Sequence, residues 1–295
     1  MKKDLISIKD LSAEEIEGIF NLTDQLKKNK DRFSKALAGK TLALIFQKPS
    51  NRTRVSFEVG MYQLGGNSIY LAPDEINLGV RETIEDVAKT LSRYVDAIVL
   101  RTYSHSNALE MAKYATVPVI NGLSDFSHPC QALADLYTIK EKLGTFAGKI
   151  LTYIGDGNNV CNSLLFVSAK MGLNMRVAAP EGYAPRREVL SGAQLFHSPE
   201  EAAKGADVLY TDVWASMGQE KEAKKRKQAF KNFQLNGRLV KLAKPKVLIM
   251  HCLPAHRGEE ISAEVMEGPN SVVFDQAENR MHAQKAVLLK LLGAD

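Results

Sequence analysis

Short apolar runs alternate along the chain with longer segments in which apolar residues recur three and four positions apart. That periodicity predicts helices in the longer segments, such as Val55–Leu64, Leu133–Leu143 and the last one, His282–Leu292. Parallel strands that are buried on both faces have continuous apolar sequences. We therefore expect strands at the runs Thr41–Phe46, Ser68–Leu71, Ala97–Leu100, Val117–Ile120, Lys149–Ile154, Met175–Ala178, Val208–Thr211, Val247–Met250 and Ser271–Phe274.

The alternation of strands and helices predicts an α/β fold with mostly parallel sheets. A polar stretch that contains glycine, Lys140–Gly148, separates the chain into two halves. The length of 295 residues agrees with two domains, because a domain has roughly 150 residues. We expect two domains, each a mostly parallel sheet flanked by helices. A cleft between such domains is a common place for a small-molecule site.

The composition excludes several classes of protein. Hydrophobic residues make up 45% and charged residues 25% of the chain, which rules out a disordered or collagen-like protein. The longest apolar run, Leu42–Phe46, has five residues, whereas a membrane-spanning helix needs about 20. The first residues lack the apolar segment of a signal peptide. We therefore expect a cytoplasmic protein that has no membrane partner.

The number of cysteines and the net charge restrict the expected compartment and partners further. The three cysteines, Cys130, Cys161 and Cys252, lie far apart, which supports neither a disulfide framework nor a zinc site. This usage is typical of a reducing compartment. The net charge of +5 comes partly from Lys221–Lys231, and we interpret the run Glu220–Lys231 as a solvated helix face. We expect no nucleic-acid partner, although a mild positive charge is compatible with a small anionic substrate.

The first candidate motif, Lys48–Glu58, follows a strand and opens a helix. Ser50 is a good N-cap. Arg52 and Arg54 lie in the first turn, where the helix dipole disfavours positive charge. This arrangement makes sense if an anion binds there; the alternative is a surface helix whose arginines turn to solvent. We expect the buried stripe of this helix to consist of Val55, Val59 and Tyr62.

Two further motifs have polar residues at the start of helices. His128 precedes Pro129, a residue that suits a first helical turn. It either donates a hydrogen bond to a polarised carbonyl or simply caps the helix. The second motif, Gly155–Val160, resembles the start of a dinucleotide fingerprint, but Val160 replaces its third glycine. The alternative is a turn that presents amide side chains to a polar substrate.

Three other motifs follow strands or precede the last helix. Asp212 ends a strand, a favourable place for a ligand-binding acid, and we expect the nearby Trp214 to be buried. Cys252 also follows a strand; it is a candidate nucleophile without an obvious base, and a buried free cysteine is the common case. Arg280, before the last helix, is either part of a site or an ordinary surface arginine.

Taken together, these motifs resemble those of the ornithine carbamoyltransferase family, within the aspartate/ornithine carbamoyltransferase superfamily. The resemblance extends from about Leu5 to Leu292. Aspartate carbamoyltransferases lack the last two motifs, so we disfavour that branch. The motifs that carry the resemblance, in the family's order and spacing, are Ser50–Arg54, His128–Gln131, Asp212 with Ser216–Gly218, and His251–Pro254.

The resemblance implies a carbamoyl phosphate-binding domain, residues 1–140 plus 278–295, and an ornithine-binding domain, residues 141–277. The C-terminal helix would pack back on the first domain. The family forms homotrimers or multiples of trimers, with active sites shared between chains. The reaction requires neither a metal nor an organic cofactor.

The site residues implied by the resemblance divide into two sets. Carbamoyl phosphate would contact Ser50, Asn51, Arg52, Thr53, Asn77, Arg101, His128, Gln131, Cys252, Leu253 and Arg280, with Asn77 reaching a neighbouring subunit's site. Asn51 stands where the family usually has threonine. L-Ornithine would contact Asn159, Asp212, Ser216 and Met217, with Cys252 and Leu253 near its side-chain amine. The catalytic residues would be Arg101, His128 and Cys252, the last as an orienting group and not as a covalent nucleophile.

The implied activity is transfer of the carbamoyl group of carbamoyl phosphate to the δ-amine of L-ornithine, giving citrulline and phosphate, as in arginine biosynthesis. The alternative is a carbamoyltransferase that acts on another amine, such as putrescine or an acylated ornithine. Two rivals from other classes are a nucleotide-dependent dehydrogenase built on Gly155–Val160, and a non-catalytic member that binds a substrate as a regulatory subunit.

Overall fold

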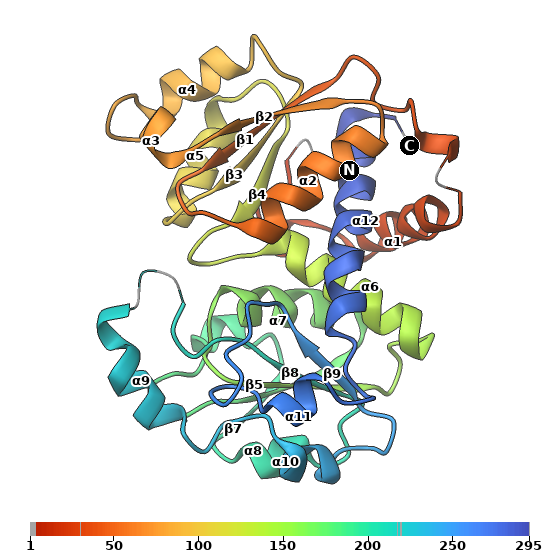
Figure 1. Cartoon of the computed structure of the whole chain (residues 1–295), viewed down its shortest axis with the longest axis vertical. Coiled ribbons are helices and arrows are strands. Elements are labelled where there is room, and N and C mark those ends of the chain that lie inside the picture. The colour runs from red at the N-terminus through yellow and green to blue at the C-terminus, as the bar shows by residue number, and fades with distance from the viewer. Residues whose placement is uncertain (1–3, 30, 217, 219, 295) are drawn as a thin grey trace. The chain divides into compact units, whose positions relative to one another are not determined.

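The computed structural model describes residues 4–29, 31–216, 218 and 220–294. The chain divides into two compact units (Figure 1). The first unit comprises Met1–Tyr137 and Glu278–Asp295, and the second comprises Thr138–Ala277. Each unit contains one sheet, and every strand pair of the described residues is parallel. The predicted α/β fold class is therefore confirmed.

The first unit has a four-stranded sheet in the order β2-β1-β3-β4. Its strands are β1 (Thr41–Phe46), β2 (Asn67–Leu71), β3 (Ala97–Arg101) and β4 (Val119–Leu123). Apolar side chains from the sheet, among them Ile45, Ile98 and Val119, share a buried core with Val87 and Met111 of the helices. The helices that begin in this unit are η1 (Ile8–Asp10), α1 (Ala13–Lys28), η2 (Asp31–Phe33), α2 (Asn51–Gln63), α3 (Pro73–Ile76), α4 (Ile84–Leu91), α5 (His105–Tyr114) and α6 (Pro129–Leu143).

The second unit has a five-stranded sheet in the order β7-β6-β5-β8-β9. The chain winds outward in opposite directions from β5, so the strand order reverses between β5 and β8. Ligands of open α/β sheets bind outside the carboxyl ends of the strands at such a point. The strands are β5 (Ile150–Ile154), β6 (Asn174–Ala178), β7 (Gln194–Phe196), β8 (Val208–Thr211) and β9 (Leu248–His251). The helices are α7 (Asn159–Met171), η3 (Arg187–Val189), α8 (Pro199–Ala203), η4 (Glu220–Glu222), α9 (Ala223–Phe230), α10 (Gly237–Leu242) and α11 (Ala263–Met266).

The C-terminal helix α12 (Val273–Leu292) packs on α1 and α2 of the first unit, as predicted (Figure 1). Lys27 Nζ of α1 donates to Asn279 Oδ1 at 2.8 Å. Ser56 Oγ of α2 donates to Gln284 Oε1 at 2.9 Å. A Cβ added at Gly60 of α2 would lie 3.2 Å from Lys285 Cγ, so the helices approach closely there. These contacts hold Arg280, between Asn279 and Gln284 in sequence, against the start of α2.

Some expected elements are wrong. Of the expected strand Ser271–Phe274, the last two residues begin α12, and only Ser271 forms an isolated bridge, with Ile249. A run of only three apolar residues, here Val272–Phe274, fits a strand and the start of a helix equally well, so the pattern alone does not decide between them. The strand expected at Val117–Ile120 lies at Val119–Leu123. Strand β7 has two exposed residues among its three, so it lacks the apolar run that identifies the others.

The expected buried face of α2 is also wrong. Val55 and Tyr62 are 47% and 82% exposed. The residues that α2 buries are Thr53, Phe57, Gly60 and Met61. Thr53 is polar and Gly60 has no side chain, so neither contributes to the hydrophobic pattern. Thr53 is nevertheless hydrogen-bonded within the protein, and Gly60 allows α12 to approach closely. The hydrophobic pattern therefore pointed to the wrong face of this helix.

Burial of His282 predicts a pH-dependent stability. This side chain of α12 is 2% exposed, and burial, followed by the charge of Lys285, lowers its pKa to about 4. The unfolded state therefore binds a proton below about pH 6.5 that the folded state resists. Stability from this group is complete above pH 6.5 and is lost as the pH falls toward 4. We expect the wild type to lose about 1–2 kcal/mol more than His282→Gln between pH 7 and 4.5, allowing for partial screening.

Urea unfolding of both proteins at the two pH values measures this difference. The control is His197→Gln, because His197 is exposed. An equal loss of stability in wild type and His282→Gln would contradict the prediction.

Candidate active site

The start of α2 contains the first candidate motif. Ser50 is the N-cap, and its Oγ accepts a hydrogen bond from Thr53 N at 3.2 Å, as predicted. The two first-turn arginines differ. Arg54 Nε pairs with Glu58 at 3.0 Å, and its guanidinium lies 3.6 Å from the Tyr70 ring centroid. The charge of Arg52 acts on the buried His128. The interpretation as a surface arginine therefore fits Arg54, whereas Arg52 stays a candidate for an anion site.

Arg280 connects three elements of the first unit through its guanidinium. Its Nη2 donates to Thr53 Oγ1 of α2 at 3.0 Å, and its Nη1 donates to Gln131 Oε1 of α6. Its Nε donates to Gln284 Oε1, one turn further along α12, at 3.2 Å. Arg280 is 3% exposed, so it is not an ordinary surface arginine. The predicted residues Thr53, Gln131 and Arg280 thus lie together in the structure.

His128 lies at the entrance to α6 with three arginines around it. It is 5% exposed. Burial lowers the pKa of the imidazole well below its usual value, and the charges of Arg280, Arg101 and Arg52 lower it further. His128 is therefore a neutral imidazole at physiological pH. A neutral imidazole can donate an N–H to an oxygen that gains negative charge, and the surrounding guanidinium groups favour an anion at the same place.

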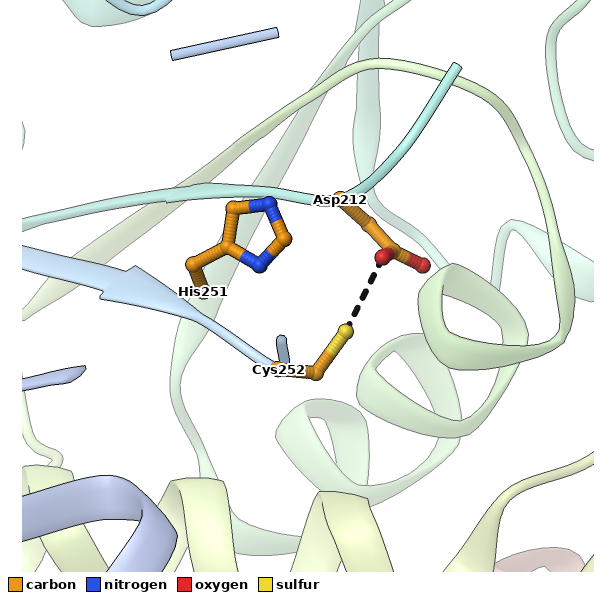
Figure 2. Close-up of side chains that lie close together, drawn as sticks. All are labelled: Asp212, His251 and Cys252. Atoms are coloured by element: carbon orange, nitrogen blue, oxygen red, sulfur yellow. Dashed lines mark hydrogen bonds between the residues drawn. The ribbon is translucent and has the colours of Figure 1, made fainter. Parts of the chain in front are cut away.

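In the second unit, three polar groups meet at the carboxyl ends of neighbouring strands. Asp212 follows β8 and Cys252 follows β9. Cys252 Sγ donates to Asp212 Oδ1 at 3.0 Å, and Figure 2 shows these side chains pointing toward each other. Asn158 Nδ2 donates to Asp212 Oδ2 at 2.7 Å. Asn158 also caps α7 by accepting from the N–H groups of Val160 and Cys161. The carboxylate of Asp212 is thus held from both sides.

His251, beside this pair, shapes the turn that follows β9. Its Nδ1 accepts from Leu253 N at 2.9 Å, so the ring proton lies on Nε2, which contacts Glu260 Oε1 at 3.1 Å. Both His251 and Glu260 are buried. Leu253 has a φ of 59°, a left-handed conformation that is uncommon for leucine. The bond to His251 holds this backbone, and the next peptide, Leu253–Pro254, is cis.

Among the described residues, two groups of side chains have donor atoms close enough for a metal ion, but hydrogen bonds or ion pairs already engage donors in each group. In the first group, Asp212, His251 and Cys252, both ring nitrogens of His251 are engaged and the thiol donates to the carboxylate. In the second, His256, Glu259 and Glu260, Glu259 Oε1 pairs with Lys227 at 2.6 Å. Neither group is preformed for a cation.

The segment after β8 is anchored by Arg226 of α9. Its Nη1 lies 3.0 Å from Asp156 Oδ2 and donates to Trp214 O at 3.1 Å. Arg226 is buried, so the helix predicted as a solvated face has one inward-facing cation. Burial raises the pKa of Asp156 to about 6, in spite of this arginine. Trp214 is 6% exposed, as predicted, and stacks on Phe230.

The Gly155–Val160 turn has no room for a dinucleotide to approach closely at Gly157. Gly157 N donates to Tyr183 O at 2.8 Å, and a Cβ added at Gly157 would lie 2.3 Å from Pro185 N. The glycine is required because protein backbone approaches it. This is the place where a Rossmann loop admits the pyrophosphate. The structure therefore disfavours the dehydrogenase hypothesis.

The remaining predicted residues have no hydrogen bond to Arg280 or Asp212 among those that the structure gives for the described residues. Asn77 is exposed and left-handed (φ 41°) at the end of α3, and no hydrogen bond given by the structure joins it to the Arg280 cluster. Asn51 is exposed at the first position of α2. Asn159 is the first residue of α7, and its Oδ1 accepts from Val160 N at 3.0 Å. Ser216 is half-buried, and Met217 lies outside the described residues.

Sequence reasoning did not single out three residues that hold these clusters. Asn158 lies within the Gly155–Val160 motif and contacts Asp212 directly. Gln284 contacts Arg280 and Ser56 from α12. Asp135 contacts Gln131 one turn along α6, a spacing that the sequence displays. A carboxylate four residues after Gln131 on the same helix indicates this hydrogen bond from the sequence alone.

No helix in the described part of the chain combines the length and the apolar character needed to cross a membrane.

The family model described as aspartate/ornithine carbamoyltransferase, carbamoyl-P binding domain, matches residues 3–141. The model for the Asp/Orn binding domain of the same family matches residues 147–291.

Similar proteins cover almost the whole chain. The ornithine carbamoyltransferase of Thermococcus kodakarensis is 54% identical over 99% of this chain and 96% of its own length. The anabolic ornithine carbamoyltransferase of Pyrococcus furiosus is 55% identical with the same coverage. The solved structure of the Pyrococcus furiosus enzyme superposes with a TM-score of 0.95 over 98% of this chain and 97% of that one. On this evidence the chain belongs to the ornithine carbamoyltransferase family.

Proposed function

We propose that the protein transfers the carbamoyl group of carbamoyl phosphate to the δ-amine of L-ornithine, giving citrulline and phosphate. The observation that carries the proposal is the neutral, buried His128 among Arg52, Arg101 and Arg280. An acyl phosphate brings both an anion and a carbonyl oxygen, and this cluster offers cations and an N–H donor together. The family match supplies the acceptor, since the relatives at 54% and 55% identity are named ornithine carbamoyltransferases.

The first unit would bind carbamoyl phosphate. The N–H groups and hydroxyls of Ser50–Thr53 would hold the phosphate, because the start of a helix favours an anion. Arg52 and Arg280 would neutralise its charge. Arg101, His128 and Thr53 would donate to the carbonyl oxygen, and Gln131 would contact the carbamoyl amine. Asn77, exposed on a loop, would act in the site of a neighbouring subunit.

The second unit would bind L-ornithine. The Asp212 carboxylate, held by Asn158 and Cys252, would accept hydrogen bonds from the α-ammonium group. Asn159, Ser216 and Met217 would contact the α-amino and α-carboxylate groups. Cys252 and Leu253 would lie near the side-chain amine and contact carbamoyl phosphate. Cys252 donates its S–H in the structure, so we assign it an orienting role and no covalent step.

In the reaction, the lone pair of the δ-nitrogen attacks the carbonyl carbon. A C–N bond forms, the C–O bond to phosphate breaks, phosphate leaves with the bonding electrons, and the proton that the nitrogen loses passes to the departing phosphate. Only an uncharged amine can attack. The pKa of a free alkyl ammonium such as lysine's is about 10, so only a small fraction of ornithine is reactive at neutral pH. No metal or organic cofactor is needed for this step.

The need for a neutral amine predicts the pH dependence. We expect kcat/KM for ornithine to rise steeply from pH 6.5 to 8.5, by up to about tenfold per unit, because the free-base fraction rises at that rate below its pKa. His128 remains neutral across this range, since its pKa is far lower. Initial rates at saturating carbamoyl phosphate measure the profile. A profile that is flat from mildly acid to alkaline pH would contradict this account.

A panel of acceptors tests the proposal against its alternative. Purified protein with carbamoyl phosphate is offered ornithine, putrescine, N-acetylornithine and aspartate, and the carbamoylated products are measured. We expect rapid turnover with ornithine alone. Preference for another amine would keep the carbamoyl phosphate site and overturn the acceptor assignment. Turnover with none, while carbamoyl phosphate still binds, would support the non-catalytic alternative.

We further propose that the protein is a cytoplasmic homotrimer, or a multiple of trimers, in arginine biosynthesis. The family resemblance supports this assembly, and the exposed position of Asn77 is compatible with it. Sedimentation equilibrium tests it, with about three times the chain mass of 32.6 kDa, or a multiple of that, as the expected result. A monomer at assay concentrations would contradict a site shared between chains.

A further inference from the structure

A buried hydrogen-bonded chain in the first unit extends beyond the residues assigned so far. Asp135 lies one turn after Gln131 on α6 and is fully buried. Gln131 Nε2 donates to Asp135 Oδ1 at 2.8 Å. At the other end of the same amide, Oε1 accepts from Arg280 Nη1. The side chain of Gln131 therefore lies between a carboxylate and a guanidinium.

These two partners enforce the same orientation of the amide. A carboxylate oxygen accepts, so the atom that faces Asp135 is the NH₂ group; a guanidinium only donates, so the atom that faces Arg280 is the oxygen. A flipped amide would set its NH₂ against the guanidinium and its oxygen against the carboxylate. Both charge-assisted hydrogen bonds would be lost. Asp135 and Arg280 thus fix which end of Gln131 is an acceptor.

Arg280 has little freedom to adjust to a flipped amide. Thr53 Oγ1 accepts from its Nη2 at 3.0 Å, and Gln284 Oε1 accepts from its Nε at 3.2 Å. Gln284 is itself held, because Ser56 Oγ donates to the same oxygen at 2.9 Å. The guanidinium is fixed through all three nitrogens, so it holds the oxygen end of the Gln131 amide, and Asp135 provides the second bond, which holds the NH₂ end.

We infer that Asp135 is a positioning residue that makes the site select an acyl phosphate whose transferred group carries N–H donors. This inference rests on the proposed function. A carbonyl oxygen has two lone pairs, and Arg280 uses one of them at Gln131 Oε1. The other accepts an N–H of the carbamoyl NH₂. Acetyl phosphate has a methyl group at that position, which leaves the acceptor unsatisfied, and sites that lose a hydrogen bond reject an isosteric ligand strongly.

Exchanging the two functional groups tests the orientation itself. In Asp135→Asn the partner of Gln131 both donates and accepts, so the NH₂ end of the amide is no longer fixed and only the one bond to Arg280 holds the oxygen end. In Gln131→Glu two carboxylates face each other. When both substitutions are combined, the new carboxylate at position 131 has only acceptor oxygens, and the new amide at position 135 donates to one of them. The double variant therefore restores a fixed acceptor at position 131 and keeps the original net charge. A general structural role of Asp135 does not predict this recovery.

The readout is the apparent dissociation constant of three ligands, obtained from protection against thermal unfolding: carbamoyl phosphate, acetyl phosphate and inorganic phosphate. We expect Asp135→Asn to weaken the binding of carbamoyl phosphate about tenfold relative to that of acetyl phosphate. The dissociation constant of inorganic phosphate should change less than threefold. The double variant should recover most of the preference. Asp24→Asn is the matched control, because Asp24 accepts a hydrogen bond from Tyr137 of the same helix at 2.7 Å.

Two results would overturn the inference: an unchanged preference in Asp135→Asn, or equal weakening of all three ligands without recovery in the double variant. If Asp135→Asn does not fold, the double variant decides. Its preference for carbamoyl phosphate over acetyl phosphate must then exceed that of Gln131→Glu. Citrulline formation by the wild type is measured separately. If it fails while the carbamoyl phosphate preference behaves as described, the proposed function is wrong and the inference about Asp135 stands.

Discussion

Replacing His128 with alanine should lower kcat by about 10²–10³, the loss expected for one oxyanion donor, with a much smaller change in KM. The oxygen of the carbonyl gains negative charge only as the amine attacks, so a donor that faces it stabilises the transition state more than the bound substrate. His128 fits this role because it is buried and its pKa is held well below the usual value by burial and by the neighbouring arginines. It therefore donates an N–H without releasing a proton.

Steady-state kinetics on three variants measure this effect. His128→Asn keeps an N–H donor on a shorter side chain and should retain more activity than His128→Ala. Arg101→Ala should also lower kcat more than it raises KM, because Arg101 lies at the end of β3 and its charge acts on His128. The exposed His197→Ala should behave as wild type. If His128→Ala kept kcat within threefold and changed only KM for carbamoyl phosphate, its role as a transition-state donor would be wrong.

Replacing Asp212 with alanine should raise KM for ornithine by about 10²-fold or more, since removal of one partner from a buried ionic contact costs about 3–5 kcal/mol. Asp212 is 5% exposed, and its two carboxylate oxygens are aligned by Asn158 and Cys252. A preorganised carboxylate binds an ammonium group without first having to be oriented. KM for carbamoyl phosphate should change little.

Variants at the partners of Asp212 refine this prediction. Cys252→Ser keeps a donor to the carboxylate and should raise KM for ornithine less than Asp212→Ala does. Asn158→Ala removes both the contact to Asp212 and the N-cap of α7, so its unfolding must be measured alongside its kinetics. A large rise in KM for carbamoyl phosphate in Asp212→Ala, with KM for ornithine unchanged, would contradict the acceptor assignment.

The strands that are buried on both faces of a sheet could be predicted from the sequence. Thr41–Phe46 and Val208–Thr211 are central strands, and their apolar runs coincide with β1 and β8. The failures lie where tertiary contacts override the pattern. Tyr62 is a large apolar residue that α2 exposes, whereas Thr53 is buried because Arg280 bonds it. An exposed edge strand such as β7 has no apolar run to detect.

The site was predictable at strand ends, because parallel strands bring their carboxyl ends to one edge of the sheet. Asp212 and Cys252 follow neighbouring strands and do meet. Residues that act through others were not found. Gln284 reaches Ser56 across 228 positions of sequence, and no local pattern reports such a contact. The roles of Asn77, Asn159, Ser216 and Met217 depend on the family resemblance alone and stay predictions.

The measurement that tests the central claim most directly is transfer of a labelled carbamoyl carbon. The purified protein is mixed with ¹³C-carbamoyl phosphate and L-ornithine, and the products are followed by NMR. The account predicts that the label enters the ureido carbon of citrulline at the rate at which phosphate appears, and that His128→Ala slows both equally. Release of phosphate without labelled citrulline, or no reaction with ornithine while another amine becomes labelled, would contradict it.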